Sequence, residues 1–272
     1  INNPLKSDLG MVSSQQWLAS EVGAKILEEG GNAVDAAVAT GFALAVVLPR
    51  AGNVGGGGFM MVYLEELGKT IAIDYREMAP ALAHEDLFLD ESGNVDNQLA
   101  RYSGKSAGVP GTVAGLIYAL EKYGTMTLKE VLSPAIELAE NGFIVGNDLE
   151  VNLRRNELKL SRTPAGQVKF YPSSGDFYKA GDVFRQPDLT KTLKRIEDKG
   201  VEGFYRGETA DLIVAEMARS GGIITHKDLE NFKVAERSPV LGTYRGHKIV
   251  SMPPSSSGGI HVIQMLNILE NF

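Results

Sequence analysis

NAVDAAVATGFALAVVLPRAGNVGGGGFMMVYLEELGKTIAIDYRE, residues 32–77, is the stretch that decides the fold. From Ala36 to Leu48 only Thr40 is polar, so this part predicts a helix that is apolar on nearly every side and buried inside a layered domain. It is too short to span a bilayer, which needs roughly 20 apolar residues. We therefore expect no membrane span here.

Beyond the helix, four consecutive glycines lead into a predicted β-hairpin. Phe59 to Leu64 is continuously apolar, which is typical of a strand covered on both faces. Gly68 lies in a polar turn, and Thr70 to Arg76 reads as the second strand.

Helical signals recur on both sides of this segment. Thr127 and Glu130 have the spacing of a capping box, and Thr225 is placed to cap a short helix. Other segments are assigned by periodicity: helices at 15–31, 111–124, 187–199 and 208–220, a short strand at 9–14, a polar, turn-rich region at 150–185, and strand-like sequence at 241–252. Helices around a few buried strands predict a mixed α and β protein without a dividing linker.

Composition excludes several classes of function. The 272 residues carry a formal net charge of −7 and no block of basic residues, so a nucleic-acid partner is not expected. The chain has no cysteine, which excludes disulfides, thiolate metal sites and a cysteine nucleophile.

The glycine run does not match a phosphate-binding loop. A Walker A motif needs Lys and Ser or Thr after its last glycine, whereas Phe59 and Met60 follow Gly58. Phosphate loops also join a strand to a helix, and here the predicted order is helix, glycines, strand. Gly55 to Gly58 are better interpreted as a place where backbone passes close to other backbone. We expect no cofactor.

Two further motifs are incomplete. GKSAG matches the nucleophile pattern G-x-S-x-G at Ser106, but a polar segment precedes it where a buried strand is required. HEDLF begins like a zinc motif and ends in Phe88 where the second histidine would be. His226, His247 and His261 have no ligand spacing, so we expect no metal.

Arg76 is the candidate binding residue. Side chains of the second strand alternate between two faces, with Ile71, Ile73 and Tyr75 on one and Ala72, Asp74 and Arg76 on the other. Arg76 therefore stands at a strand end. From the residues alone, an ion pair with Asp74 or Glu77, or plain solvation, competes with a second role, bidentate binding of a substrate carboxylate.

The sequence as a whole resembles the γ-glutamyltranspeptidases of bacterial type. The matching pieces run in family order from about residue 10 to residue 272: GGNAVDAAVATGFALAVV, GNVGGGGFM, DYREMAP, GVPGTVAG, KYGT, ELAENGF, GGIITHKDL and SMPPSSSGGI. Their number and order carry the resemblance, since no single motif would suffice.

The resemblance implies an α+β fold, a four-layer α-β-β-α sandwich of the N-terminal-nucleophile hydrolase type, to which this chain contributes part. In that family a precursor cleaves itself into two subunits, and the N-terminal threonine of the small subunit attacks γ-glutamyl amides such as glutathione. The chain resembles the large subunit, so we expect no catalytic residue in it. The arginine of the REMAP motif, here Arg76, is implied to bind the α-carboxylate of the γ-glutamyl group.

The expected assembly is a heterodimer with the small subunit, periplasmic or secreted. Residues 1–272 are expected to form a single domain that lacks its C-terminal end, because the last helix reaches Phe272 without a stop signal. Two alternatives stay open: a related acylase, acting on cephalosporins or on a poly-γ-glutamate capsule, and a non-catalytic scaffold subunit.

Overall fold

The computed structural model describes residues 6–171 and 176–272. Contacts within the chain group into two units, each assembled from two separate stretches. Unit 1 comprises Ile1–Asn53 and Tyr123–Gly203, and unit 2 comprises Val54–Lys122 and Phe204–Phe272. The assignment of residues 1–272 to one domain stays a prediction.

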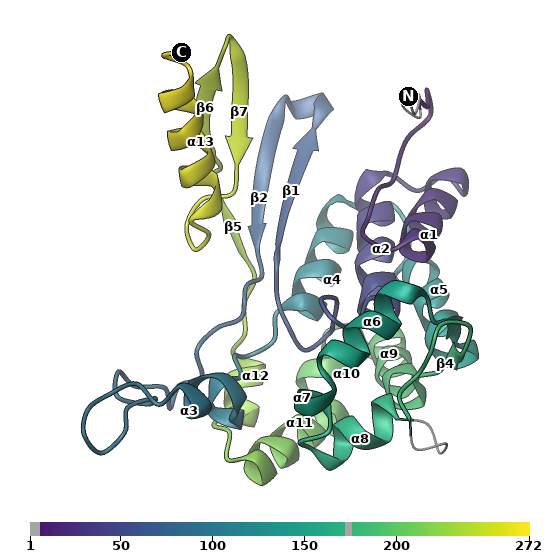
Figure 1. Cartoon of the computed structure of the whole chain (residues 1–272). Coiled ribbons are helices and arrows are strands. Elements are labelled where there is room, and N and C mark those ends of the chain that lie inside the picture. The colour runs from purple at the N-terminus through teal and green to yellow at the C-terminus, as the bar shows by residue number, and fades with distance from the viewer. Residues whose placement is uncertain (1–5, 172–175) are drawn as a thin grey trace. The chain divides into compact units, whose positions relative to one another are not determined.

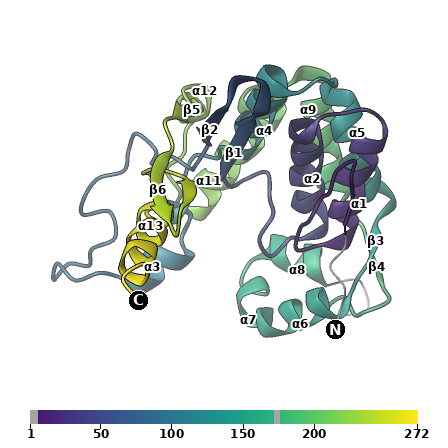
Figure 2. The same ribbon diagram turned by 90° about the horizontal axis from the view of Figure 1, so that it is seen from above.

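Unit 1 is mainly helical. Helix α2 (Ala33–Val47) packs against α1 (Trp17–Glu28) and against α5 (Leu128–Asn141), and α5 packs on α9 (Pro187–Lys199). Figure 1 and Figure 2 show these helices gathered together. The remaining elements of unit 1 are β3 (Phe143–Ile144), α6 (Asn147–Arg155), α7 (Glu157–Leu160), α8 (Pro164–Phe170) and β4 (Val183–Phe184). Phe42 on α2 is fully buried, which confirms the predicted core helix.

The start of α2 is fixed by a reciprocal cap. The Asn32 side chain accepts hydrogen bonds from the backbone N–H groups of Val34 and Asp35, and the Asp35 carboxylate accepts one from the N–H of Asn32. The Asn32 amide also donates to the carbonyl of Tyr123 at 2.8 Å. The cap therefore joins α2 to the chain about ninety residues downstream.

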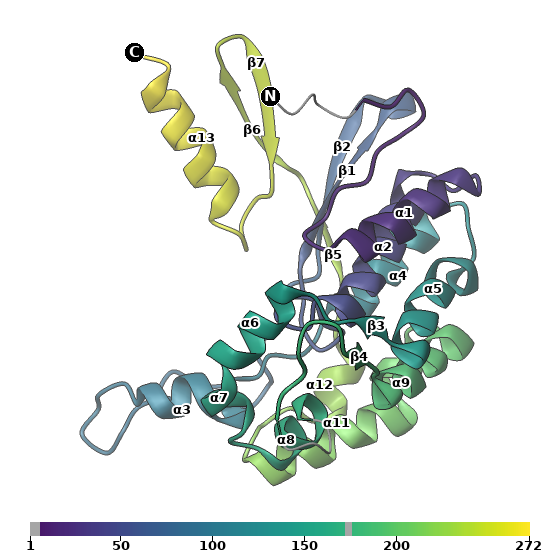
Figure 3. The same cartoon turned by 45° about the vertical axis from the view of Figure 1, so that its right-hand side comes forward.

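Unit 2 is built on a three-stranded antiparallel sheet with the order β1-β2-β5. Strands β1 (Phe59–Leu64) and β2 (Lys69–Asp74) form the predicted hairpin, and β5 (Ala235–Arg237) pairs with the other edge of β2. A second hairpin, β6 (Val240–Tyr244) and β7 (His247–Ser251), lies beside α13 (Gly258–Leu269) in Figure 3. The other elements are η1 (Glu65–Leu67), α3 (Asn97–Tyr102), η2 (Gly104–Ser106), α4 (Thr112–Tyr123), α11 (Gly207–Ser220) and α12 (His226–Glu230). Helix α10 (Glu202–Tyr205) is divided along the chain, with Glu202 and Gly203 in unit 1 and the rest in unit 2.

Three sequence predictions are wrong. Strand β1 is not covered on both faces, because Met61 and Tyr63 are 37% and 60% exposed while Val62 between them is buried. Residues 9–14 take no strand, since no neighbouring strand of the described chain pairs with them. The turn-rich region at 150–185 includes most of α6 and all of α7 and α8, which have nine, four and seven residues, so each helix is too short to repeat a periodic pattern many times.

The capped helices agree with the sequence. Both capping boxes that begin at Thr127 and Thr225 are formed. In the described part of the chain, no helix is both long enough and apolar enough to cross a membrane.

Candidate functional site

The candidate site lies in unit 2, where β2 ends. Asp74 and Tyr75 are buried and Arg76 is exposed. Tyr75 remains paired one residue beyond the strand, since its N–H donates to the carbonyl of Gly58 and its own carbonyl accepts from the N–H of Gly58. Arg76 is thus the first residue after β2 whose side chain reaches solvent.

The glycine run lies against the backbone that follows β2, at Tyr75 and Glu77. A Cβ atom on Gly57 would lie 2.6 Å from the carbonyl oxygen of Tyr75 and 2.7 Å from the backbone nitrogen of Glu77. The carbonyl of Gly56 accepts hydrogen bonds from the N–H groups of Gly111 and Thr112, at 2.7 and 3.0 Å. Close approach of backbone to backbone, which the sequence predicted for the run, is confirmed at Gly57.

The ring of Tyr75 packs against α4. A Cβ atom built on Gly115 of α4 would lie 2.0 Å from the ring of Tyr75, so only glycine lets the helix lie against it. The Tyr75 hydroxyl donates to the carbonyl of Phe59 at 3.4 Å. Burial raises the pKa of Tyr75 to about 12, so the phenol stays neutral and contributes packing rather than charge.

Asp74 is the buried anion of the site, with only 6% of its surface exposed. Its Oδ2 atom accepts from Nε of Arg237 at 2.7 Å and from Oγ of Ser255 at 3.0 Å, and its Oδ1 atom accepts from the N–H of Arg76 at 3.1 Å. Burial by itself raises the pKa of Asp74, but the hydrogen bonds from Arg237, Arg76 and Ser255 together outweigh it and hold that pKa below its usual value. The carboxyl is therefore charged at neutral pH.

The guanidinium of Arg76 has a neutral partner. Its Nη1 atom donates to the backbone carbonyl of Ser255 at 2.8 Å. Within the described chain it forms no ion pair with a carboxylate; Asp74 contacts Arg76 only through the backbone N–H, and the ion-pair partner of Asp74 is Arg237. The alternative of an ion pair with Asp74 or Glu77 is therefore wrong, and the positive charge of Arg76 is not neutralised.

Strand register explains the pairing with Arg237. In the antiparallel pair β2–β5, Asp74 lies opposite Ala235, and Arg237 lies opposite Ala72. Asp74 and Arg237 are thus diagonal neighbours on one sheet face, a separation that a long side chain can bridge.

The other sequence candidates do not form a site. Ser106 lies in η2 after a helix, not after a strand, and its hydroxyl donates to the carbonyl of Ser103 at 2.8 Å. Nε2 of His226 lies 2.8 Å from a carboxylate oxygen of Asp211. Across residues 6–171 and 176–272, no group of three or more His, Asp or Glu side chains is arranged to hold a metal.

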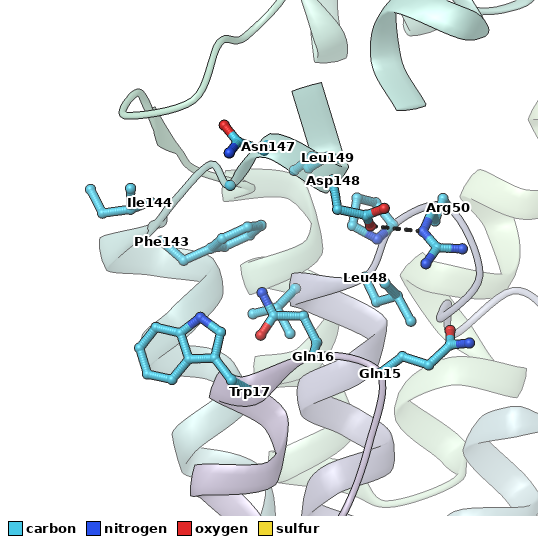
Figure 4. A pocket seen from close by; sticks show the side chains of 13 residues that line it. Gln15, Gln16, Trp17, Leu48, Arg50, Phe143, Ile144, Asn147, Asp148 and Leu149 are labelled. Atoms are coloured by element: carbon cyan, nitrogen blue, oxygen red, sulfur yellow. Dashed lines mark hydrogen bonds and ion pairs between the residues drawn. The ribbon is translucent and has the colours of Figure 1, made fainter. Parts of the chain in front are cut away.

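Unit 1 contains a pocket of about 430 Å³ between the start of α1, the end of α2 and the start of α6 (Figure 4). Trp17 lies at its edge with 69% of its surface exposed, and Phe143 is buried in its wall. Arg50 lies in this pocket, but its Nε atom is 3.1 Å from Oδ2 of Asp148, so its charge is already balanced. None of the candidate residues predicted from the sequence lines this pocket.

A family model described as gamma-glutamyltranspeptidase matches residues 19–272. The chain belongs to the gamma-glutamyltranspeptidase family. It is 48% identical over 270 residues to the glutathione hydrolase proenzyme of Escherichia coli K12, an alignment that covers 99% of this chain and 46% of that protein. The chain thus spans about half the length of the curated relatives it matches.

Solved structures agree with this membership. The gamma-glutamyltranspeptidase of Helicobacter pylori superposes with a TM-score of 0.97 at 48% identity, over 99% of this chain and 77% of that one. The expected α+β fold class of this family is confirmed. Similarity extends to the acylase ACY 1 proenzyme of Pseudomonas sp. V22, at 39% identity over 99% of this chain and 49% of that protein.

Two members of the candidate site were missed from the sequence. Ser255 lies in the loop PPSSSGG, whose run of small and polar residues is a signal for a functional loop, although not for contact with Arg76. Arg237 carries no local signal, because its role depends on the pairing of β5 with a strand about 160 residues earlier.

Proposed function

We propose that this chain is the large-subunit part of a γ-glutamyltransferase that also acts as a glutathione hydrolase. With a small subunit cut from the same precursor, it cleaves γ-glutamyl amides such as glutathione. The γ-glutamyl group passes through an ester with the N-terminal threonine of the small subunit and then to water, an amino acid or a peptide. Residues 1–272 serve as one large-subunit domain of this heterodimer.

The observation that carries the proposal is the state of Arg76. Its guanidinium is exposed, held by the neutral carbonyl of Ser255, and not paired with a carboxylate of the described chain. A guanidinium binds a carboxylate through charge-assisted hydrogen bonds, often in bidentate geometry. An arginine held in place with its charge unbalanced fits the α-carboxylate of a γ-glutamyl substrate.

The nucleophile is proposed to lie on the partner, and this chain contributes no catalytic residue. A threonine hydroxyl is a weak nucleophile at neutral pH unless a base lies beside it. The free α-amino group of an N-terminal threonine has a reference pKa of roughly 7.7–8.0 and suits this role. No metal or cofactor enters the proposed reaction.

Apolar surface in unit 2 supports the partner subunit. Met61 and Tyr63 expose one face of β1. Helix α13 exposes a second set: Ile260, Val262, Met265, Ile268 and Leu269. Exposed apolar surface of this kind marks protein–protein contact, and the small subunit is the occupant we propose. Family resemblance further supports a periplasmic or secreted location, which fractionation of the source cells would test.

Substitution of Arg76 tests the proposal. In the enzyme assembled from the full precursor, Arg76→Gln should raise KM for γ-glutamyl-p-nitroanilide by roughly 10- to 100-fold, because a hydrogen bond to a charged group contributes about 1.5–3 kcal/mol. The matched control is Arg219→Gln, because Arg219 is an exposed arginine that pairs with Glu216 on its own helix. An unchanged KM in Arg76→Gln would contradict the proposed role.

A related acylase is the second candidate, favoured by the similarity to the Pseudomonas acylase. A glutaryl amide presents the same terminal carboxylate as a γ-glutamyl amide and lacks only the α-amino group. Arg76 would bind both, so the two activities must be separated by substrate. We expect faster turnover of γ-glutamyl-p-nitroanilide than of glutaryl-p-nitroanilide; the reverse order would favour the acylase. The scaffold alternative, in which this chain only supports a partner, predicts that Arg76→Gln leaves KM for both substrates unchanged.

A further inference from the structure

Two opposite charges lie very close together at the end of β2. Asp74 and Arg76 are two residues apart, and the Asp74 carboxylate is 3.1 Å from the backbone nitrogen of Arg76. A buried carboxylate in this position is a natural ion-pair partner for the neighbouring guanidinium. If the two side chains paired, the charge that Arg76 offers to a substrate carboxylate would be neutralised.

The cation that pairs with the Asp74 carboxylate is Arg237. Its Nε atom lies 2.7 Å from Oδ2 of Asp74, closer than the other donors that Asp74 accepts. The ion pair links two strands of one sheet, so Arg237 reaches Asp74 from β5 while Arg76 leaves β2 at its end. The positive charge that balances Asp74 therefore comes from Arg237 and not from Arg76.

Ser255 connects the carboxylate to the guanidinium. Its hydroxyl donates to Oδ2 of Asp74 at 3.0 Å, and its backbone carbonyl accepts from Nη1 of Arg76 at 2.8 Å. Ser255 thus links the two groups, because its side chain contacts Asp74 and its main chain contacts Arg76.

We propose that Arg237 is a positioning residue that keeps Asp74 from pairing with Arg76, so that the guanidinium of Arg76 retains its charge for the substrate carboxylate. Arg237 acts through Asp74 and does not touch the substrate. The inference rests on the proposed function of Arg76.

The first test is Arg237→Gln in the enzyme assembled from the full precursor. Glutamine removes the charge, and the freed Asp74 carboxylate should turn to Arg76. KM for γ-glutamyl-p-nitroanilide should rise on the order of tenfold, the effect of losing one charged hydrogen bond, while kcat changes little. Arg237→Lys keeps the charge and should recover much of the loss. Arg219→Gln is the control.

The decisive variant is the double substitution Asp74→Asn with Arg237→Gln. Removing the competing carboxylate should bring KM back toward the value of Asp74→Asn alone, and below that of Arg237→Gln. A purely structural role predicts the opposite, because the second substitution would add further damage. The carboxylate-free substrate 4-aminobutanoyl-p-nitroanilide gives an independent readout, since its KM should respond little to Arg237→Gln.

The outcomes separate this inference from the function on which it rests. If Arg76→Gln raises KM but Arg237→Gln does not, or if the double variant is no better than Arg237→Gln, the role of Arg237 is overturned and the proposed function stands. If Arg76→Gln has no effect on KM, the proposed role of Arg76 fails and the inference fails with it, whereas absence of γ-glutamyl-p-nitroanilide turnover by the assembled wild-type enzyme would overturn the proposed function itself. Should Arg237→Gln not assemble, Asp74→Asn is compared with the double variant, and a further rise in KM would overturn the proposal.

Discussion

Asp35 in unit 1 and Asp74 in unit 2 are both buried carboxylates, 0% and 6% exposed, yet they are satisfied by different kinds of donor. Among the residues that the structure describes, the donors to Asp35 are all neutral: the backbone N–H groups of Asn32, Thr125 and Met126 and the hydroxyl of Thr125. These bonds tie the start of α2 to the loop before α5. The role of Asp35 is to hold two distant segments of unit 1 together.

Asp74 is satisfied by a charged side chain, a hydroxyl and one backbone N–H. Its neighbour Arg76 leaves the strand with an unbalanced charge. The two carboxylates therefore have different roles. Asp35, bound by neutral donors, holds two segments of the chain together. Asp74 pairs with the cation Arg237, so the second cation, Arg76, keeps its charge available for a ligand. Substitutions should therefore affect stability at Asp35 and substrate affinity around Asp74.

The largest effect is expected from Asp35→Ala. It leaves buried backbone N–H groups without an acceptor, and each unmet donor costs about 1–3 kcal/mol, so the free energy of unfolding should fall by roughly 3–5 kcal/mol. Urea denaturation of the assembled enzyme measures it. The control is Asp188→Ala, because the side chain of Asp188 is 83% exposed and its substitution should change stability by less than about 0.5 kcal/mol. If the Asp35 variant loses less than about 1 kcal/mol, Asp35 does not hold unit 1 together, and the proposed contrast with Asp74 fails.

The second largest effect is expected from low pH, which should weaken the hydrogen bonds that Asp35 accepts. Burial raises the pKa of Asp35, but hydrogen bonds from Thr125, Asn32 and Met126 outweigh it, so the folded pKa lies below the usual value. A depressed carboxyl pKa stabilises the fold above the unfolded pKa of about 3.9 and loses that contribution as pH falls through the folded pKa. Stability should therefore drop below about pH 4, and Asp35→Asn should flatten that drop. An equally steep drop in the variant would contradict the assignment.

Gly57→Ala should have a moderate effect that falls on the binding site. The new Cβ would lie 2.6 Å from the carbonyl oxygen of Tyr75, so the backbone that carries Arg76 must move. Overpacking of this kind costs typically about 1–3 kcal/mol. We expect KM for γ-glutamyl-p-nitroanilide to rise together with the loss of stability. A stability loss with unchanged KM would show that the glycine run does not position Arg76.

The smallest effect is expected from Arg50→Gln. Arg50 is balanced by Asp148 in a partly exposed pair, with 36% and 69% of the two side chains exposed. Such pairs contribute less than about 1 kcal/mol, and neither stability nor KM should change measurably. A rise in KM here would show that the pocket in Figure 4, and not Arg76, contacts substrate.

Local patterns predicted most of the fold and placed one residue of the candidate site, Arg76, at a strand end. The apolar run of α2, the two capping boxes and the first hairpin depend on near neighbours in the sequence, and all of them are formed. Arg76 could be placed at a strand end because β2 alternates visibly and the REMAP motif resembles the family. The same local logic failed at β1, where a continuous apolar run predicted cover on both faces and Tyr63 is exposed.

The rest of the site depends on long-range pairing. Arg237 reaches Asp74 only because β5 pairs with β2 in one particular register, and Ser255 reaches it from a loop about 180 residues downstream. Neither contact follows from periodicity or from a short motif. A sequence can reveal a charged residue at a strand end, but not which distant residue balances the charge beside it.

The central claim, that Arg76 binds the α-carboxylate of a γ-glutamyl substrate, is tested most directly by one ratio. This is kcat/KM for γ-glutamyl-p-nitroanilide divided by kcat/KM for 4-aminobutanoyl-p-nitroanilide, which lacks only that carboxylate. The assembled wild-type enzyme should strongly prefer the first substrate, and Arg76→Gln should reduce the preference by roughly 10- to 100-fold by slowing only that substrate. An equal loss on both substrates, with the ratio unchanged, would contradict the claim.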